Sequence, residues 1–170
     1  TEEAAVSPPL LPGDRVFTDA AGRAEFQFPD GTVVRLDARS KLDYSGHEEG
    51  AEERIVLRLW SGSAIARVRG VSSTRFEIET PAGTVEVRGR ALVRADVEAG
   101  ELRLSVSSGE AVLDDGRERT RVAAGERPFA RWGAPAEEPR RFDLSERDDF
   151  ARWDGQREAE DGWAVRSSEY

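Results

Sequence analysis

The chain has 170 residues, a length that fits one domain with short extensions. Charged residues make up 35% of it and the formal net charge is −9, so nucleic acids and anionic membranes would be repelled unless the charges were segregated. The absence of cysteine excludes disulfides, thiolate metal sites and a cysteine nucleophile.

The first elements predicted along the chain are an N-terminal arm and a β-hairpin. Residues 1–12 hold three prolines and no hydrophobic periodicity, which predicts an extended arm. From there the pattern becomes regular. Residues 24–28 alternate apolar and polar side chains, Pro29-Asp30-Gly31 forms a turn, and residues 32–36 return as a second strand.

The central part of the chain predicts further strands separated by loops. Residues 41–45 form one strand, and the acidic tract 46–53 is expected to be a solvated loop. Residues 54–60 form the next strand, which Ser61-Gly62 should end, and residues 64–68 form another.

The rest of the body continues with short alternating segments that end at glycine turns. These predicted strands lie at residues 76–78, 85–87, 91–97, 102–106, 111–113, 119–122 and 127–131. Many short strands at intervals of roughly 8–12 residues indicate an all-β fold. We therefore predict short antiparallel strands in two stacked sheets over residues 13–132, as a sandwich or an irregular solenoid.

Residues 133–170 differ in character from the body. A Pro/Ala-rich linker precedes a segment that predicts one short amphipathic helix, with Ser145 as its N-cap. Phe150 and Trp153 would share one face of that helix, which suits docking on the body or on a partner. An extended tail is expected from Gly162 onwards.

No residue pattern predicts catalysis, a cofactor or a metal site. His47 is the only histidine, and it lacks the further ligands of a metal site or a positioned partner for proton transfer. The acidic segments Asp19–Gly22 and Asp114-Asp115-Gly116 lack calcium-loop spacing and predict turns. The pair Asp148-Asp149 suits the N-terminus of the predicted helix.

Two groups of residues are candidates for binding a partner. Arg88 and Arg90 flank Gly89 and form a small basic site that suits a carboxylate or a phosphate, although exposed solvated arginines explain them as well. Aromatic side chains outside the β body suit a protein interface or a contact of the tail with its own domain. These aromatic candidates are Trp132, Phe150, Trp153, Trp163 and Tyr170.

Six segments of the body form a recognisable series of motifs. They are Pro29-Asp30-Gly31, Leu57-x-x-x-Ser61-Gly62, Phe76-x-Ile78-x-Thr80-Pro81-x-Gly83, Val85-x-Val87-Arg88-Gly89, Val106-x-x-Gly109-Glu110-Ala111-Val112 and Ala124-Gly125-Glu126. With these motifs, the sequence from Gly13 to about Phe129 resembles the FecR-type domain of bacterial extracytoplasmic proteins. The family usually has threonine and then an aromatic two positions later after Arg-Gly, where this chain has Arg90 and Leu92. The tail is similar to a longer subset of the family in its Phe150-x-x-Trp153 motif and the Arg157-Glu158 pair.

The resemblance implies a non-catalytic module in the periplasm or elsewhere outside the cytoplasm. Signalling members relay the state of an outer-membrane transporter through a membrane span and a cytoplasmic helical domain. This chain contains no apolar run near the roughly 18 residues of a span, so we expect no membrane insertion by the chain itself. Thr1 is not a translation start, because methionine is absent, and a removed signal peptide or anchor would fit that start.

Three functional hypotheses follow. The first, which the sequence favours, is an accessory or structural subunit that docks by protein–protein contact on the extracytoplasmic face of a membrane complex. The second is a sensory or regulatory FecR-type domain of a signalling system. The third is a carbohydrate- or polymer-binding β-sandwich that uses surface tryptophans. None of them requires a cofactor, and none involves nucleic acid.

Overall fold

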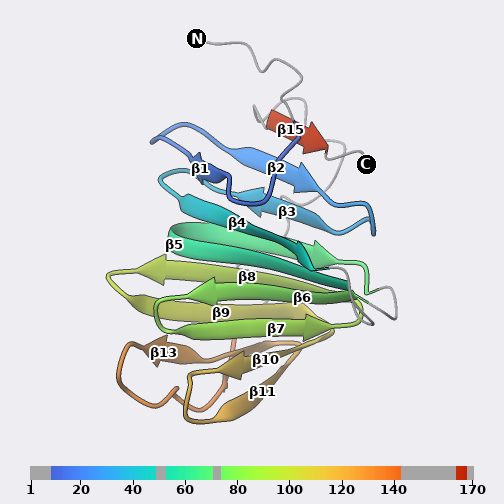
Figure 1. Cartoon of the computed structure of the whole chain (residues 1–170). Helices are drawn as coiled ribbons and strands as arrows, with labels where there is room; N and C mark the ends of the chain where they lie inside the picture. The colour runs from blue at the N-terminus through green and yellow to red at the C-terminus, as the bar shows by residue number, and fades with distance from the viewer. Residues whose placement is uncertain (1–8, 49–52, 71–73, 143–163, 168–170) are drawn as a thin grey trace.

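The computed structural model describes residues 9–48, 53–70, 74–142 and 164–167, and these residues form strands, turns and loops without a helix (Figure 1). The strands are β1 (Arg15–Phe17), β2 (Ala24–Gln27), β3 (Val33–Leu36), β4 (Lys41–Glu48), β5 (Glu53–Val68), β6 (Thr74–Thr80), β7 (Gly83–Arg88), β8 (Ala91–Glu98), β9 (Glu101–Ser108), β10 (Glu110–Asp114), β11 (Arg119–Ala123), β12 (Glu126–Arg127), β13 (Phe129–Arg131), β14 (Arg140–Arg141) and β15 (Ala164–Ser167). The all-β prediction is confirmed.

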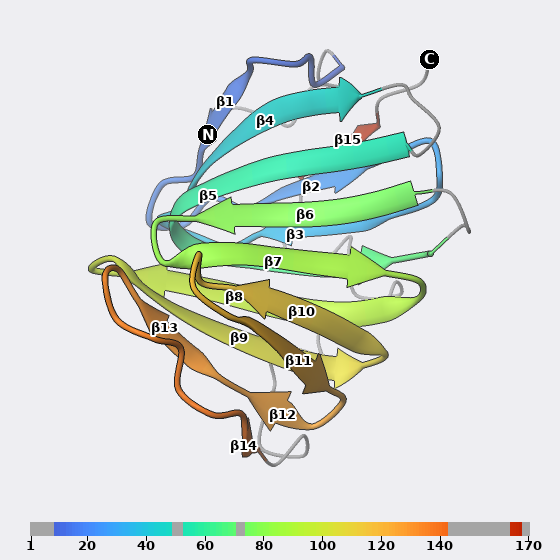
Figure 2. The ribbon, with the colours of Figure 1, turned by 60° about the horizontal axis from the view of Figure 1, so that its bottom comes forward.

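The strands stack in two layers that share β5 (Figure 2). We name the first layer sheet A, with the order β1-β4-β5-β6-β7-β10-β11. The second layer is sheet B, with the order β15-β2-β3-β5-β8-β9-β13. A separate pair, β12 and β14, completes the described strands. The prediction of two stacked sheets is therefore correct.

Strand β5 joins the layers, and here the sequence-based prediction of two separate strands is wrong. Its first half pairs with β4 and β6 in sheet A, and its second half pairs with β3 and β8 in sheet B. Gly62 makes the bend possible, because its φ of 88° is a conformation that side chains disfavour. A Cβ at Gly62 would lie 2.1 Å from Oγ of Ser40, whose hydroxyl accepts the backbone N–H of Ser63 at 3.0 Å.

The predicted loop over residues 46–53 is also partly wrong, because strand pairing extends into it. Strand β4 continues to Glu48, with His47 opposite Ile55 of β5. A register shift between Tyr44 and Gly46 lets the strand pass the glycine, which has a φ of 120°. Backbone pairing with β5 thus overrides the polar, turn-like composition of this segment.

The core lies between the sheets and follows the period-two pattern of the strands. Sheet A contributes mainly large side chains, among them Leu42, Tyr44, Ile55, Leu57, Leu59, Phe76, Ile78, Val85, Val87 and Leu113. Sheet B adds many small ones, among them Ala24, Ala64, Ala66, Ala91, Ala95 and Ala130. The edge-on contact of Phe28 with Tyr44, at 5.8 Å between ring centroids, shows how the layers meet. Full burial of each large aliphatic or Phe side chain contributes roughly 1.5–3 kcal/mol.

Most neighbouring strands run antiparallel, as predicted, and the hairpin formed by β2 and β3 has the expected turn. Two pairs are parallel: β5 with β6, and β15 with β2. Leu10, in the predicted N-terminal arm, is buried and belongs to the core. The helix predicted around Phe150 and Trp153 lies outside the described residues. None of the described segments is a helix long and apolar enough to cross a membrane.

Candidate functional site

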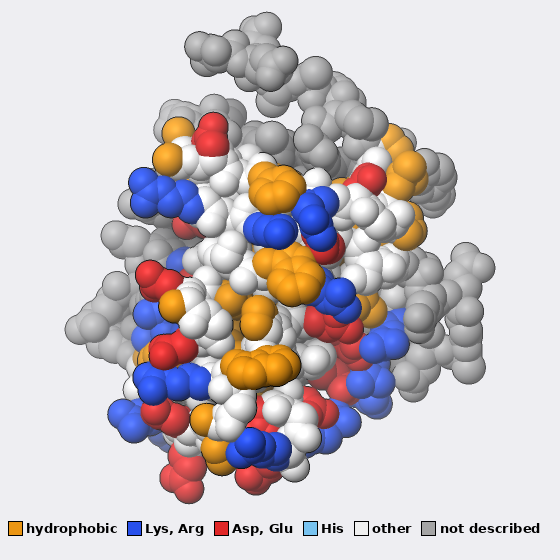
Figure 3. Space-filling view, turned by 60° about the vertical axis from the view of Figure 1, so that its left-hand side comes forward, with side chains coloured by type: hydrophobic (Ala, Val, Ile, Leu, Met, Phe, Trp, Pro, Cys, Tyr) orange, Lys and Arg blue, Asp and Glu red, His pale blue; other side chains and the backbone are white. Residues whose placement is uncertain are grey.

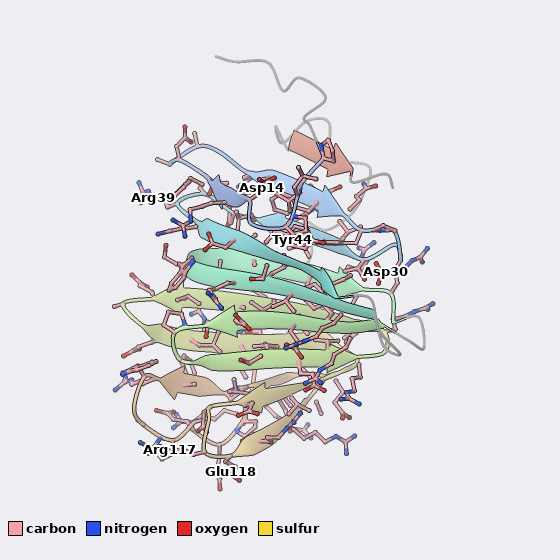
Figure 4. All side chains as sticks on the ribbon, viewed as in Figure 1. Asp14, Asp30, Arg39, Tyr44, Arg117 and Glu118 are labelled. Carbon is pink, nitrogen blue, oxygen red and sulfur yellow. The ribbon has the colours of Figure 1, made fainter. Side chains whose placement is uncertain are left out.

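In the acidic segments predicted as turns, the carboxylates accept hydrogen bonds from nearby backbone N–H groups. Oδ1 of Asp19 accepts the backbone N–H groups of Ala21 and Gly22, at 2.9 and 2.5 Å. Asp115 accepts from the backbone of Glu118, Ala136 and Arg117, and these hydrogen bonds lower the pKa of its carboxyl group. Arg117 and Glu118 lie at the tip of the β10–β11 hairpin (Figure 4). Among the residues that the structure describes, no three His, Asp or Glu side chains gather to hold a metal ion.

Of the predicted aromatic contact residues, the structure describes Trp132 alone. It follows β13 directly and is 81% exposed. Phe150, Trp153, Trp163 and Tyr170 lie outside the described residues. Their part in partner binding therefore stays a prediction.

The two predicted basic residues occupy different environments. Arg88 ends β7, and its Nε donates to Oε1 of Glu86 at 2.5 Å. Arg90 is exposed in the turn between β7 and β8 and takes no part in the ion pairs around Glu86. A Cβ at Gly109 would lie only 2.2 Å from the backbone oxygen of Arg90, so the turn packs closely against Gly109.

Arg88 belongs to a larger group on the outer face of sheet A, which the sequence analysis missed. We name it the arginine cluster, and its members are Arg54, Arg75, Arg88, Arg119, Glu77 and Glu86. The residues come from β5, β6, β7 and β11, and the side chains on this face of the sheet are drawn in Figure 4.

Two buried carboxylates hold the arginine cluster together. Glu86 binds Arg75 and Arg88 at 2.5 Å and Arg119 at 2.7 Å. Glu77 binds Arg54 at 2.6 Å and Arg75 at 2.5 Å. Burial raises the pKa of Glu86, but hydrogen bonds from Arg88 and Arg119 and the charge of Arg75 outweigh that effect, so its pKa is lowered.

The two charge types in the cluster differ in their access to solvent. The side chains of Glu77 and Glu86 are 2% and 5% exposed, whereas those of the four arginines are 30–62% exposed. The solvent-exposed part of the cluster is therefore cationic, and the exposed carboxylates of Glu110 and Asp114 lie beside it on the same sheet. Guanidinium forks match the geometry of carboxylates, and here they are paired with Glu77 and Glu86.

A second group on the same sheet surrounds Trp60, close to the bend of β5. Nζ of Lys41, the only lysine of the chain, lies 5.6 Å from the ring centroid of Phe17 and 5.7 Å from that of Trp60. The indole N–H of Trp60 donates to Asp43 at 2.8 Å, and Asp43 also accepts two hydrogen bonds from Arg15, at 2.6 and 2.9 Å. Figure 3 shows separate exposed hydrophobic side chains among charged ones on this side of the molecule.

The environment of Asp43 strongly favours its charged form. The hydrogen bond from Arg15 is the main cause, with support from the Trp60 indole and the charge of Lys41, and together they lower the pKa of Asp43 to about 2 against the opposing effect of burial. Trp60 shares the outward register of Arg54 and Arg58 along β5. That register is the signal by which the sequence could have placed Trp60 on the outer face.

The outer face of sheet B also carries charges, and two of its ion pairs are largely removed from solvent. Nε of Arg35 donates to Oε2 of Glu25 at 2.7 Å, and both side chains are 2% exposed. Asp96 accepts from Ser63 at 2.6 Å and from Arg94 at 2.7 Å. Burial raises the pKa of Asp96, but these contacts and the charge of Arg103 lower it overall.

A cavity of about 360 Å³ lies beside Asp96, at the end of the β8–β9 hairpin. Its charged lining consists of Asp96, Glu98, Glu101 and Arg103. Arg103 donates to Asp96 at 3.1 Å and Glu101 pairs with Arg131, so two of its carboxylates already have cationic partners. The arrangement offers neither an activated nucleophile nor a group of metal ligands.

Comparison with known proteins identifies a matching family model and solved structures with a similar fold. The family model described as FecR protein matches residues 14–112, from just before β1 into β10. Crystal structures at 1.65 and 2.50 Å of a protein from Parabacteroides distasonis ATCC 8503, described as a "putative anti-sigma factor", align with a TM-score of 0.65 and 19% sequence identity. The alignment covers 78% of this chain and 61% of that chain, so less than two thirds of the Parabacteroides protein is represented. Among curated proteins, none matches the chain.

Proposed function

Because the chain belongs to the FecR protein family, we propose that it is a regulatory FecR-type module that acts by binding another protein and carries out no catalysis. The family match over residues 14–112 is the observation that carries this proposal. The description of the Parabacteroides protein as an anti-sigma factor supports a regulatory role more than the accessory-subunit hypothesis. We also propose a location outside the cytoplasm, as is typical of this domain.

The geometry supports a binding role. The two sheets enclose a continuous core, so the outer face of sheet A is presented by a scaffold of paired strands. That face exposes arginines and a tryptophan, both of which are frequent at the centres of protein interfaces. At Trp60 a polysaccharide platform is less well supported, because Lys41 and Arg58 lie against its ring at 5.7 and 5.5 Å.

Transcript profiling in the cells from which the gene comes tests the regulatory role. Overproduction of the chain should change transcript levels for a small set of genes. The matched control is Phe76→Asp, which places a charge in the core and should prevent folding. An unchanged transcript profile, together with stoichiometric recovery of the chain in a membrane complex, would reject regulation and favour the accessory-subunit hypothesis.

A further inference from the structure

A single row of side chains is buried on the outer face of sheet B. Its five members lie opposite one another across neighbouring strands, in the order β2, β3, β5, β8 and β9. We name them the buried row: Glu25, Arg35, Ile65, Arg94 and Ser105. Each is at most 8% exposed, and each alternates along its strand with core residues, so the row points away from the core.

Neighbouring side chains alone do not explain this burial. Gln27 and Arg67, which belong to the next row along the strands, are exposed. The exposed fractions of arginine side chains give a direct comparison: they are 30–62% in the arginine cluster of sheet A, but 2% for Arg35 and 10% for Arg94. An arginine on an open sheet face keeps its guanidinium group in water. A further part of the chain therefore lies over the buried row.

The two ends of the buried row meet the two ends of residues 143–163. At β9, Nε of Arg127 donates to Oγ of Ser105 at 2.8 Å, and the guanidinium carbon of Arg127 lies 4.2 Å from the ring centroid of Phe142. At β2, Glu25 lies opposite Val165 of β15. Strands β14 and β15 lie at opposite ends of the molecule (Figure 2). The chain thus leaves from one end of the row and returns at the other.

The length and the sequence of residues 143–163 fit this path. From β9 to β15 there are five strand spacings, which amount to about 24 Å. The segment has 21 residues, which would span about 32 Å even as a helix. Phe150 and Trp153 stand near the middle of the segment, as Ile65 stands in the middle of the row. The apolar residues of both partners are therefore in matching positions.

We propose that the buried row is the docking surface for residues 143–163 of the same chain, with Phe150 and Trp153 packed on Ile65 and on the neighbouring arginine stems. Such a contact buries apolar area and places aromatic rings against guanidinium groups. The inference goes beyond the proposed regulatory function and does not depend on it. It assigns the two aromatic residues to a contact within the chain, so the outer face of sheet A remains the surface for a partner.

Methyl NMR spectroscopy of the intact chain tests this docking. The chain has three isoleucines, and Ile65 is the one outside the core cluster. We expect nuclear Overhauser contacts between the δ1 methyl group of Ile65 and aromatic protons of Phe150 or Trp153. We also expect a soluble gadolinium chelate to relax this methyl signal as little as that of the core residue Ile78, because both are shielded from solvent.

Two variants show whether the aromatic pair is responsible. Phe150→Ser/Trp153→Ser removes apolar groups from the segment and leaves the core cluster unchanged. The contacts should then vanish, and relaxation of the Ile65 methyl signal by the chelate should rise towards that of Leu11, which is 48% exposed. Trp132→Ser is the matched control, because it removes an exposed aromatic side chain outside the segment and should leave the Ile65 signal as it is.

Three results would overturn the proposal. The first is a wild-type Ile65 methyl group without contact to either aromatic ring. The second is an equal effect of the chelate on Ile65 in the wild type and in Phe150→Ser/Trp153→Ser. The third is a set of contacts that arise only between an isotope-labelled and an unlabelled copy, because the docked segment would then belong to a second chain. The transcript response tests the regulatory function separately from all three.

Discussion

The outer faces of the two sheets use the same residue types in opposite ways. On sheet B, Arg35 and Glu25 are both removed from solvent and satisfy each other. On sheet A, the glutamates of the arginine cluster are buried while their arginines are exposed. An ion pair with both partners buried is a structural element. When only the anion is buried, the cation stays open to solvent and to other anions.

The largest effect should come from breaking the enclosed pair. Arg35→Met leaves the Glu25 carboxylate buried without its cation, and we expect the free energy of unfolding to fall by about 3–5 kcal/mol. Glu25→Leu/Arg35→Met removes both charges and should recover most of that loss. Urea unfolding at pH 7 measures both. A loss below about 1 kcal/mol in the single variant would mean that the pair is hydrated and open, as on sheet A.

Disturbing the bend at which β5 passes from sheet A to sheet B should have the next largest effect on the free energy of unfolding. Gly62→Ala puts a Cβ into Ser40 and forces a side chain into a positive φ, so we expect roughly 2–4 kcal/mol of destabilisation. Gly100→Ala is the matched control, because its Cβ would meet no atom within 4 Å although φ is 78°. Thermal unfolding compares them. Equal losses would show that φ alone, and not the contact with Ser40, governs the bend.

The charged group around Trp60 should give a smaller, pH-dependent effect. The pKa of Asp43 is about 2 in the fold, below its ordinary value of 3.8, so folding favours the carboxylate. Its contribution is present above about pH 4 and is lost as pH falls towards 2. Asp43→Asn should lower the unfolding free energy at pH 7 by roughly 0.5–1 kcal/mol. The variant should also abolish the change in the Trp60 indole N–H signal that NMR spectra of the wild type show at acid pH. If the change persists in the variant, it comes from another carboxyl group.

The smallest effect is expected at the exposed arginines of the cluster. Arg88→Ala leaves Glu86 with Arg75 and Arg119, so the free energy of unfolding should change by less than about 1 kcal/mol. Chemical unfolding at low and high salt checks this. A loss comparable to that of Arg35→Met would show that Arg88 has a structural role, and it would remove the contrast between the sheets.

Local sequence patterns predicted much of the fold. Alternation and glycine turns located the β2–β3 hairpin and the strands from β6 to β11, because neighbouring residues determine both features. The same patterns wrongly predicted a strand end at Ser61-Gly62 and a loop from Gly46 onwards. A glycine ends many strands, but it can also carry a strand through a bend or a bulge, and only the partner strand decides between these outcomes.

The arginine cluster could not be predicted, because its members are distant in sequence. The parallel pairing of β5 with β6 brings Arg54 to Arg75, and the pairing of β10 with both β7 and β11 brings Arg119 to Glu86. Neither pairing follows from local alternation. Arg88 alone was identified, and its Arg-Gly-Arg motif suggested Arg90 as its companion, which lies in the turn instead.

Affinity capture with quantitative mass spectrometry tests the central claim, that the chain regulates by binding a protein through the outer face of sheet A. Three baits are compared: the wild type, Arg88→Ala/Arg119→Ala, and the charge-matched control Arg131→Ala/Arg140→Ala. The account predicts that one partner is recovered equally with the wild type and the control, and at least about tenfold less with the cluster variant. Equal recovery with all three baits would contradict it.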